Sequence, residues 1–210
     1  KEGFSVKALL PVHLTGTTVD LKGIQFVSKK NNIKIIADSC HAIGGKYHGK
    51  PVGSCIYEDL ATFSFHPVKT VTSGEGGAIT TNNSRLAKKL RTLRSHSMEK
   101  TGSMLPWEYR IKDLGFNYRI SDFQCALGVS QLNRLEAFVK KRQMLSSHYD
   151  SLLSDHYPVI ESRTHNLSQK ELSLHLYSIL IDFENLNITR ENLINRMLKK
   201  GVATQVHYIP

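Results

Sequence analysis

Residues 20–38, DLKGIQFVSKKNNIKIIAD, decide the fold because they join a helix to a buried strand. Apolar residues recur at helical spacing from Asp20 to Lys30, and Ile33 to Ala37 is an apolar run rich in β-branched side chains. A second apolar run, Val6 to Val12, precedes the helix. A strand, a helix and a strand within about thirty residues predict a βαβ unit with parallel strands and a right-handed crossover.

The rest of the chain predicts a continuation of this α/β pattern. The expected strands are Leu60 to Phe65, Gly77 to Thr81, Leu174 to Ile181 and Val202 to Tyr208. The expected helices are one after Asn83, one of about thirty residues capped at Ser121, and Arg190 to Lys200. Residues 44–59 are expected to be irregular, and residues 161–173 to form a surface connection.

These elements predict an α/β fold with a mostly parallel sheet in a large domain, followed by the start of a smaller α/β domain. The expected boundaries are 1–125 for part of the large domain, 126–155 for a long connecting helix and 156–210 for an incomplete small domain. The chain begins without Met and stops at Pro210 directly after a strand-like run. We therefore expect it to be an internal fragment of a longer protein.

Composition narrows the classes of function. The net charge of +10 allows nucleic-acid binding, but the basic residues are scattered and no nucleic-acid motif accompanies them. An anionic small substrate such as a sugar nucleotide explains part of the excess equally well. No apolar run approaches the length of about 18 residues that a membrane span needs. The three cysteines form no C-x-x-C pair, which favours reduced thiols in a cytoplasmic protein.

The densest cluster of chemically capable residues is Phe63 to Lys69, FSFHPVK, followed by the glycine-rich run TVTSGEGG at 70–77. An expected strand delivers Ser64, and a turn then delivers Lys69. A lysine can form an imine with an aldehyde when its surroundings favour it. Taken alone, this stretch fits a solvated loop lysine somewhat better.

Asp38 changes that balance because it closes a buried strand, at the sheet edge where ligands of open α/β sheets bind. An unpaired buried carboxylate is costly, so Asp38 needs a partner. A protonated pyridine nitrogen is one such partner, and a helix cap or a salt bridge is the ordinary alternative. His41 can stack on an aromatic ring, or be structural. Ser64 and Asn117 can donate to a phosphate, or bond locally.

Other chemistries lack their motifs. The sequence contains no Walker phosphate loop, no G-x-G-x-x-G after a strand and no G-x-S-x-G nucleophile elbow. The ten histidines are dispersed and lack metal-ligand spacing, apart from His41 and His48 in an irregular loop, so no metal site is predicted.

Together these residues resemble the DegT family of pyridoxal-phosphate (PLP) sugar aminotransferases, which use the fold-type-I aminotransferase scaffold. The segments that carry the resemblance are residues 11–14, 38–42, 63–69, 74–77, 115–119 and 206–210. Within the family the sequence looks closest to members of the pseudaminic acid pathway. The features behind this comparison are His41, FSFH at 63–66, ALGVSQL at 126–132, HLY at 175–177 and the VHYIP ending.

The resemblance implies transamination of a UDP-linked 4-keto-6-deoxy-N-acetylhexosamine with glutamate as the amino donor, for bacterial surface sugars. Lys69 would hold PLP through an imine and move the proton, and Asp38 would pair with the pyridine nitrogen. His41 would stack on the ring and Ser64 would bind the phosphate. Asn117 would reach the phosphate of a neighbouring subunit, so the resemblance implies a homodimer with shared active sites. The substrate-side residues that it implies are His13, His207 and Tyr208.

Two alternatives stay open. A sugar dehydratase of the same family would typically carry histidine in place of Lys69. A non-catalytic sugar-binding or regulatory relative, with nucleic-acid contacts, would use the +10 charge, and the set of Asp38, Ser64 and Lys69 speaks against it.

Overall fold

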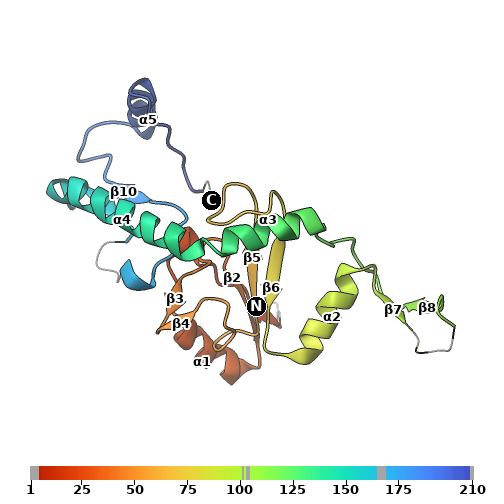
Figure 1. Cartoon of the computed structure of the whole chain (residues 1–210). Helices are drawn as coiled ribbons and strands as arrows, with labels where there is room; N and C mark the ends of the chain where they lie inside the picture. Colours follow the sequence, from red (N-terminus) through yellow and green to blue (C-terminus); the bar gives the residue numbers. More distant parts are fainter. Residues whose placement is uncertain (1–4, 101, 103–104, 165–168, 209–210) are drawn as a thin grey trace.

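The computed structural model describes residues 5–100, 102, 105–164 and 169–208. Its central sheet has the strand order β1 (Ala8–Leu9), β2 (Lys34–Asp38), β5 (Leu60–Ser64) and β6 (Gly77–Thr80). The first three strands are parallel and β6 pairs antiparallel with β5. The predicted α/β fold with a mostly parallel sheet is confirmed (Figure 1).

The predicted βαβ unit is present, with α1 (Leu21–Asn31) between β1 and β2. Asp20 caps α1 by accepting a hydrogen bond from the Gly23 amide at 3.0 Å, and Asn32 ends the helix in a left-handed conformation. Leu21 packs with Ala37 and Ala61 in the core beneath the sheet. This burial fixes the face of the sheet on which α1 lies.

A second helix and a hairpin follow the sheet. The helix expected after Asn83 is α2 (Ser84–Arg94), with Asn83 as its cap. The sequence did not predict the hairpin of β7 (Met98–Lys100) and β8 (Tyr109–Ile111), which projects from the body of the molecule (Figure 1). The segment expected to be irregular also holds a short hairpin, β3 (Lys46–Tyr47) with β4 (Lys50–Pro51).

The single long helix expected from Ser121 was wrong, because the chain forms two helices. Ser121 caps α3 (Asp122–Leu132) through a reciprocal capping box with Gln124, and α4 (Leu135–Leu153) begins after a break. The break lies at Asn133 and Arg134, and Arg134 has the non-helical angles φ −106° and ψ 0°. Apolar periodicity continues through these two residues, so the pattern alone did not reveal the break.

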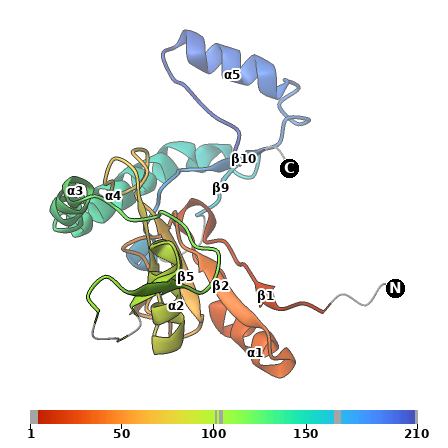
Figure 2. The same cartoon turned by 90° about the vertical axis from the view of Figure 1, so that its right-hand side faces the viewer.

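The C-terminal part of the prediction needs correction. Strand β10 (Ile179–Ile181) is shorter than expected and pairs antiparallel with β9 (Ile160–Ser162). Strand β9 overlaps the start of the segment that was expected to be a surface connection. Leu172, Ser173 and Leu174 are buried, and residues 202–208 form no strand in the described part of the chain. Ile209 and Pro210 lie outside the described residues. Helix α5 (Arg190–Lys199) agrees with the prediction and stands apart from the sheet (Figure 2).

Short helical turns complete the chain. They are η1 (Leu14–Gly16), η2 (Ser154–His156) and η3 (Gln169–Glu171). Within the described residues, no helix is both long and apolar enough to cross a membrane.

Gly16 joins η1 to the C-terminal segment. Its φ is +107°, and a Cβ added there would lie 2.1 Å from the Ser173 carbonyl oxygen. Gly49 also has a positive φ, +72°, but no atom lies within 4 Å of its added Cβ. Comparing alanine substitutions at the two glycines therefore separates the cost of a strained φ from the cost of a close contact.

We predict that Gly16→Ala lowers the free energy of unfolding of the intact protein by about 3 kcal/mol or more, because it adds a backbone clash to a strained φ. Gly49→Ala, the matched control, should cost only about 1 kcal/mol for its φ. Urea unfolding measures both. Equal losses would show that the contact between Gly16 and Ser173 does not constrain the fold.

Candidate active site

Strand pairing brings the first site residues together at one edge of the sheet. In the parallel pair of β2 and β5, Asp38 lies opposite Thr62, and Ser64 follows two residues later at the end of β5. The His13 amide donates to the Asp38 carbonyl oxygen at 2.9 Å. The carboxyl ends of parallel strands meet at one edge, which is where ligands bind in such sheets.

Lys69 is held by a structured loop. Its amide donates to the His66 carbonyl oxygen at 3.0 Å, and the loop closes where the Phe65 amide donates to Gly76 at 2.8 Å. Val71 and Ser73 are buried beneath the loop, whereas the Lys69 side chain is half-buried. The loop thus fixes the backbone of Lys69 and leaves its side chain partly exposed.

The Lys69 charge acts on a compact group of neighbours. Its electrostatic effect is felt at Asp38, Cys40, His41 and His175. Lys69, Asp38 and His41, which the sequence singled out separately, therefore form one cluster. Cys40 and His175 are members whose place in the cluster the sequence did not predict.

Asp38 is charged at neutral pH. Partial burial alone would raise the pKa of its carboxyl. Hydrogen bonding with the Cys40 side chain, the hydrogen bond that Oδ1 accepts from the Cys40 amide at 3.0 Å, and the electrostatic effects of His41 and Lys69 together outweigh burial and lower the pKa below its usual value. Among the described residues no Lys, Arg or His lies in an ion pair with this carboxylate.

His41 is buried beside the carboxylate. Its Nδ1 accepts a hydrogen bond from the Thr15 amide at 3.2 Å, and its ring centroid lies 4.5 Å from that of His175. Burial, followed by the Lys69 charge, lowers the pKa of His41, although Asp38 opposes them. The imidazole is therefore neutral and fixed in orientation at neutral pH.

The remaining predicted residues lie in different surroundings. His207 acts electrostatically on His41 and His175, so it lies near the cluster, and Tyr208 is exposed. The His13 ring is fully buried, and its Nδ1 accepts a hydrogen bond from the Val19 amide at 3.2 Å. This burial favours a structural role for His13, and substrate contact stays a prediction.

Asn117 lies elsewhere. It is exposed and forms an antiparallel bridge with Ser95 at the end of α2. Among the described residues it makes no hydrogen bond with Asp38, Ser64 or Lys69. Within one copy of the chain, Asn117 is therefore not part of the cluster.

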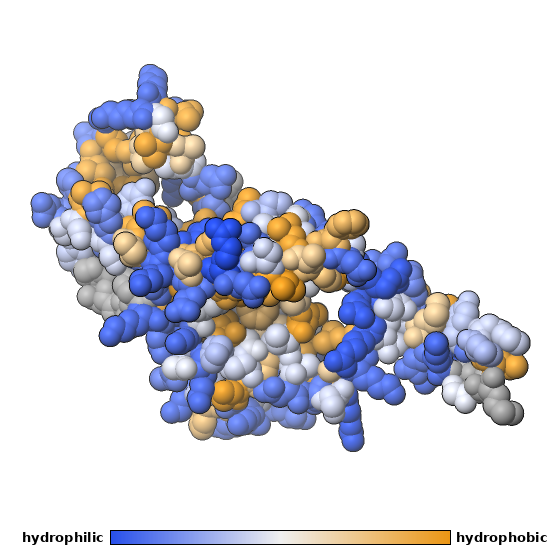
Figure 3. All heavy atoms as spheres, in the orientation of Figure 1, coloured by the Kyte–Doolittle hydropathy of each residue, from blue (hydrophilic) through white to orange (hydrophobic). Residues whose placement is uncertain are grey.

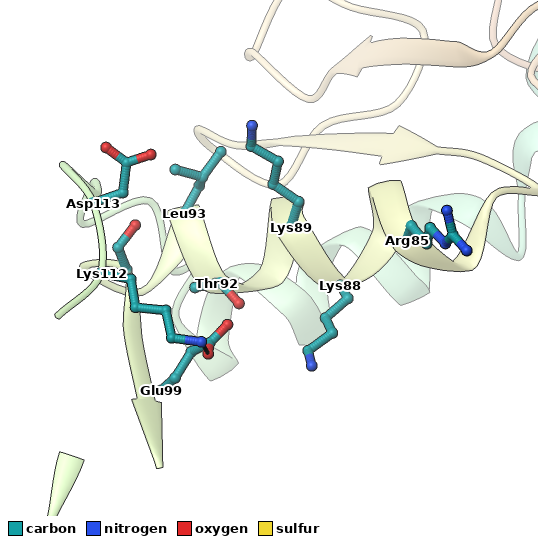
Figure 4. A pocket seen from close by; sticks show the side chains of 9 residues that line it. Arg85, Lys88, Lys89, Thr92, Leu93, Glu99, Lys112 and Asp113 are labelled. Atoms are coloured by element: carbon teal, nitrogen blue, oxygen red, sulfur yellow. Dashed lines mark ion pairs between the residues drawn. The ribbon is translucent and has the colours of Figure 1, made fainter. Parts of the chain in front are cut away.

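A separate cavity of about 250 Å³ lies between α2 and the β7–β8 hairpin (Figure 4). Lys112 and Glu99 form an ion pair of 2.6 Å beside it, and Lys88 and Lys89 point to opposite sides of α2. It is lined by Arg85, Lys88, Lys89, Thr92, Leu93, Ser97, Glu99, Lys112 and Asp113. None of the residues of the Asp38 cluster lines this cavity, so the cavity does not mark the candidate site.

The chemistry of the cluster follows from its members. A charged carboxylate without an ion pair suits a cationic ring nitrogen, and a flat neutral imidazole suits an aromatic ring. The amine of a partly exposed lysine suits a carbonyl. Together these groups can hold a flat, aldehyde-bearing ligand.

Cys40 reports on the Asp38 charge. Burial raises the pKa of its thiol to about 11, and the Asp38 carboxylate adds to the effect. We predict that Asp38→Asn speeds the alkylation of Cys40 by iodoacetamide about threefold or more at fixed pH, because loss of the negative charge lowers the thiol pKa.

Peptide mass spectrometry measures this rate. Cys55 serves as an internal control, because burial, followed by Glu58 and Asp59, raises its pKa without a contribution from Asp38. An unchanged Cys40 rate in Asp38→Asn, or an equal rise at both cysteines, would contradict the electrostatic contact.

Comparisons with known proteins match nearly the whole chain. The sequence profile described as the DegT/DnrJ/EryC1/StrS aminotransferase family matches residues 3–210. The UDP-4-amino-4,6-dideoxy-N-acetyl-beta-L-altrosamine transaminase of Campylobacter jejuni subsp. jejuni serotype O:23/36 is 40% identical over 212 residues, covering 100% of this chain and 54% of the relative. A protein of the same name from Helicobacter pylori is 34% identical over 204 residues, covering 97% and 52%.

Solved structures agree with the sequence matches. Helicobacter pylori PseC, an aminotransferase of pseudoaminic acid biosynthesis, superposes with a TM-score of 0.88 at 34% identity, covering 97% of this chain and 53% of PseC. The PLP form of the putative sugar aminotransferase Spr1654 from Streptococcus pneumoniae gives a TM-score of 0.82 at 31% identity, covering 96% and 54%. The chain spans about half the length of the curated relatives it matches. From its sequence, fold and clustered site residues, the chain belongs to the DegT/DnrJ/EryC1/StrS aminotransferase family.

Proposed function

We propose that the intact protein is a PLP-dependent transaminase that moves the amino group of glutamate onto a UDP-linked 4-keto-6-deoxy-N-acetylhexosamine, in the biosynthesis of pseudaminic acid-type surface sugars. The observation that carries the proposal is the charged, half-buried Asp38 beside Lys69, with no ion-pair partner among the described residues. The names of the Campylobacter and Helicobacter relatives support the sugar substrate. The PLP and PMP forms of Spr1654 support the cofactor.

The residues present fit this cofactor. A charged carboxylate left partly buried without a cation is costly, and a protonated pyridine nitrogen removes that cost. Asp38 would hold this nitrogen, the His41 ring would lie against the pyridine, and the Ser64 hydroxyl would donate to the phosphate. When bound, PLP supplies the aldehyde that takes the amino group and a ring that stabilises negative charge.

Each residue then has a defined task. The Lys69 amine would hold the cofactor covalently and, once released, would carry a proton on Nζ between the carbon of the amino donor and the cofactor carbon. Asp38 keeps the ring nitrogen protonated throughout. His207 and Tyr208 would contact the substrate, and glutamate and the ketosugar would use the same site in turn. Lysine at position 69 favours this reaction over the dehydratase alternative, and the three free cysteines support a cytoplasmic location.

We predict that the intact wild-type protein with PLP shows the visible absorbance band of a lysine-linked cofactor, and that glutamate removes it. Lys69→Ala should lose the band and about a thousandfold or more in transamination. Mass spectrometry of the product from defined UDP-ketosugars and glutamate measures the reaction. Lys89→Ala is the matched control because Lys89 lines the separate cavity, and it should keep both band and activity. A band of wild-type strength in Lys69→Ala would overturn the assignment.

The second part of the proposal is a homodimer with shared active sites. Exposed apolar side chains gather along α3 and the segment before it, where Leu114 is 89% and Phe123 is 90% exposed. Figure 3 shows hydrophobic residues along the course of α3. Asn117 lies in the same segment, outside its own cluster. A second copy packed on this surface would cover the apolar side chains and bring its Asn117 toward the cluster of the first.

We predict that Lys69→Ala and Asn117→Ala complement each other when the intact variants are mixed. If Asn117 acts across the interface, each mixed dimer holds one site with both defects and one with neither. Random mixing should then restore about a quarter of wild-type activity, since half the dimers are mixed. Phe123→Asp, which places a charge on the proposed interface, should lower the sedimentation coefficient to that of a monomer. No complementation between two individually defective variants would contradict the shared site.

A further inference from the structure

His175 touches the site from a distant part of the chain. Its ring centroid lies 4.5 Å from that of His41, with an interplanar angle of 49°. It follows the buried residues Leu172 to Leu174, more than a hundred residues beyond His41. The proposed function assigns His175 no role, so its contact with the predicted cofactor-stacking ring needs an explanation.

Thr15 fixes both histidines. Its amide donates to His41 Nδ1 at 3.2 Å, and its carbonyl oxygen accepts from the His175 amide at 2.8 Å. Arg142 on α4 donates to the His175 carbonyl oxygen at 3.0 Å. Because Nδ1 of His41 is an acceptor, the neutral ring carries its proton on Nε2. The backbone thus sets the position of both rings and the tautomer of His41.

The surroundings keep both rings uncharged. His175 Nδ1 is buried and has no hydrogen-bond partner among the described residues, so an imidazolium there would bury an unpartnered donor. Burial, followed by the charges of His41, Lys69, Arg142 and His207, lowers the pKa of His175 to about 4. Asp38 acts in the opposite direction at His41, because its negative charge raises the pKa of that imidazole. Because the His175 imidazole stays neutral, it shields His41 from water without placing a further positive charge beside it.

The charge state of His41 matters because Asp38 carries a single negative charge, for which a protonated His41 and a cationic ring nitrogen would compete. A protonated His41 would pair with Asp38 and would repel a cationic ring nitrogen, whereas a neutral imidazole leaves the carboxylate for that nitrogen. We propose that His175 is a positioning residue that packs against His41 and keeps its imidazole neutral and oriented, so that Asp38 remains available to the cofactor. The cofactor part of this inference rests on the proposed function. The effect on His41 does not.

The test begins with the unliganded intact protein. Nitrogen-15 NMR of the histidine side chains reports the tautomer and titration of His41 without any cofactor. In the wild type, His41 should carry its proton on Nε2 and titrate below the ordinary range of histidine. In His175→Ala, where loss of the ring should let water reach His41, that imidazole should titrate at higher pH. His175→Phe, which keeps a ring at this position, should resemble the wild type.

PLP affinity, measured by absorbance titration, gives the second readout. In His175→Ala, the affinity for PLP should fall about tenfold at about pH 6 and less at about pH 8. The reason is that His41 of this variant should be charged at the lower pH and neutral at the higher. His175→Phe should keep the wild-type affinity, as should His148→Ala, the control, which removes an exposed histidine of α4.

Three results would overturn the inference. They are an ordinary histidine titration of His41 in the wild type, an unchanged His41 titration in His175→Ala, and a loss of PLP affinity in His175→Ala that is equal at both pH values. The wild-type titration is readable even if His175→Ala fails to fold. Failure of the wild type to bind PLP would instead overturn the proposed function, and the NMR titrations would still decide the role of His175.

Discussion

Parallel pairing of β2 with β5 is the constraint on which the candidate site depends. It sets Asp38 opposite Thr62, so that Ser64 and the loop carrying Lys69 leave the sheet beside the carboxylate. A shift of one residue in this register would turn Asp38 to the opposite face. Burial of Ile35, Ala37 and Ala61 makes such a shift unfavourable, so the core of the sheet determines the placement of the reactive groups.

A second constraint comes from the C-terminal half of the chain. Residues 172–175 pack against the turn at Thr15 and Gly16, and the Ser173 hydroxyl donates to the Ile43 carbonyl oxygen. The loop that carries His41 is therefore held by residues that follow α4. The sheet edge and the C-terminal segment thus both contribute to one cluster, and the His41 ring contacts His175 of that segment.

Local patterns in the sequence predicted the βαβ unit, α2, α5 and the capped start of α3, because periodicity and capping residues act over a few positions. They missed the break at Asn133, where apolar spacing continues. They also missed the burial of Leu172 to Leu174, which depends on contact with Gly16. Asp38, His41 and Lys69 were predicted from strand ends and family motifs. The place of His175 in the cluster could not be predicted in this way, because only the tertiary structure brings His175 to His41.

The central claim is that Lys69, beside the charged Asp38, is the residue that binds PLP covalently. Borohydride reduction converts an imine into a stable amine, so it fixes the cofactor to the lysine that holds it. Peptide mass spectrometry of the reduced intact protein then locates the added mass. The account predicts that this mass lies on Lys69 and that Asp38→Asn sharply reduces it. Stoichiometric labelling of any other lysine, with Lys69 unmodified, would contradict the account.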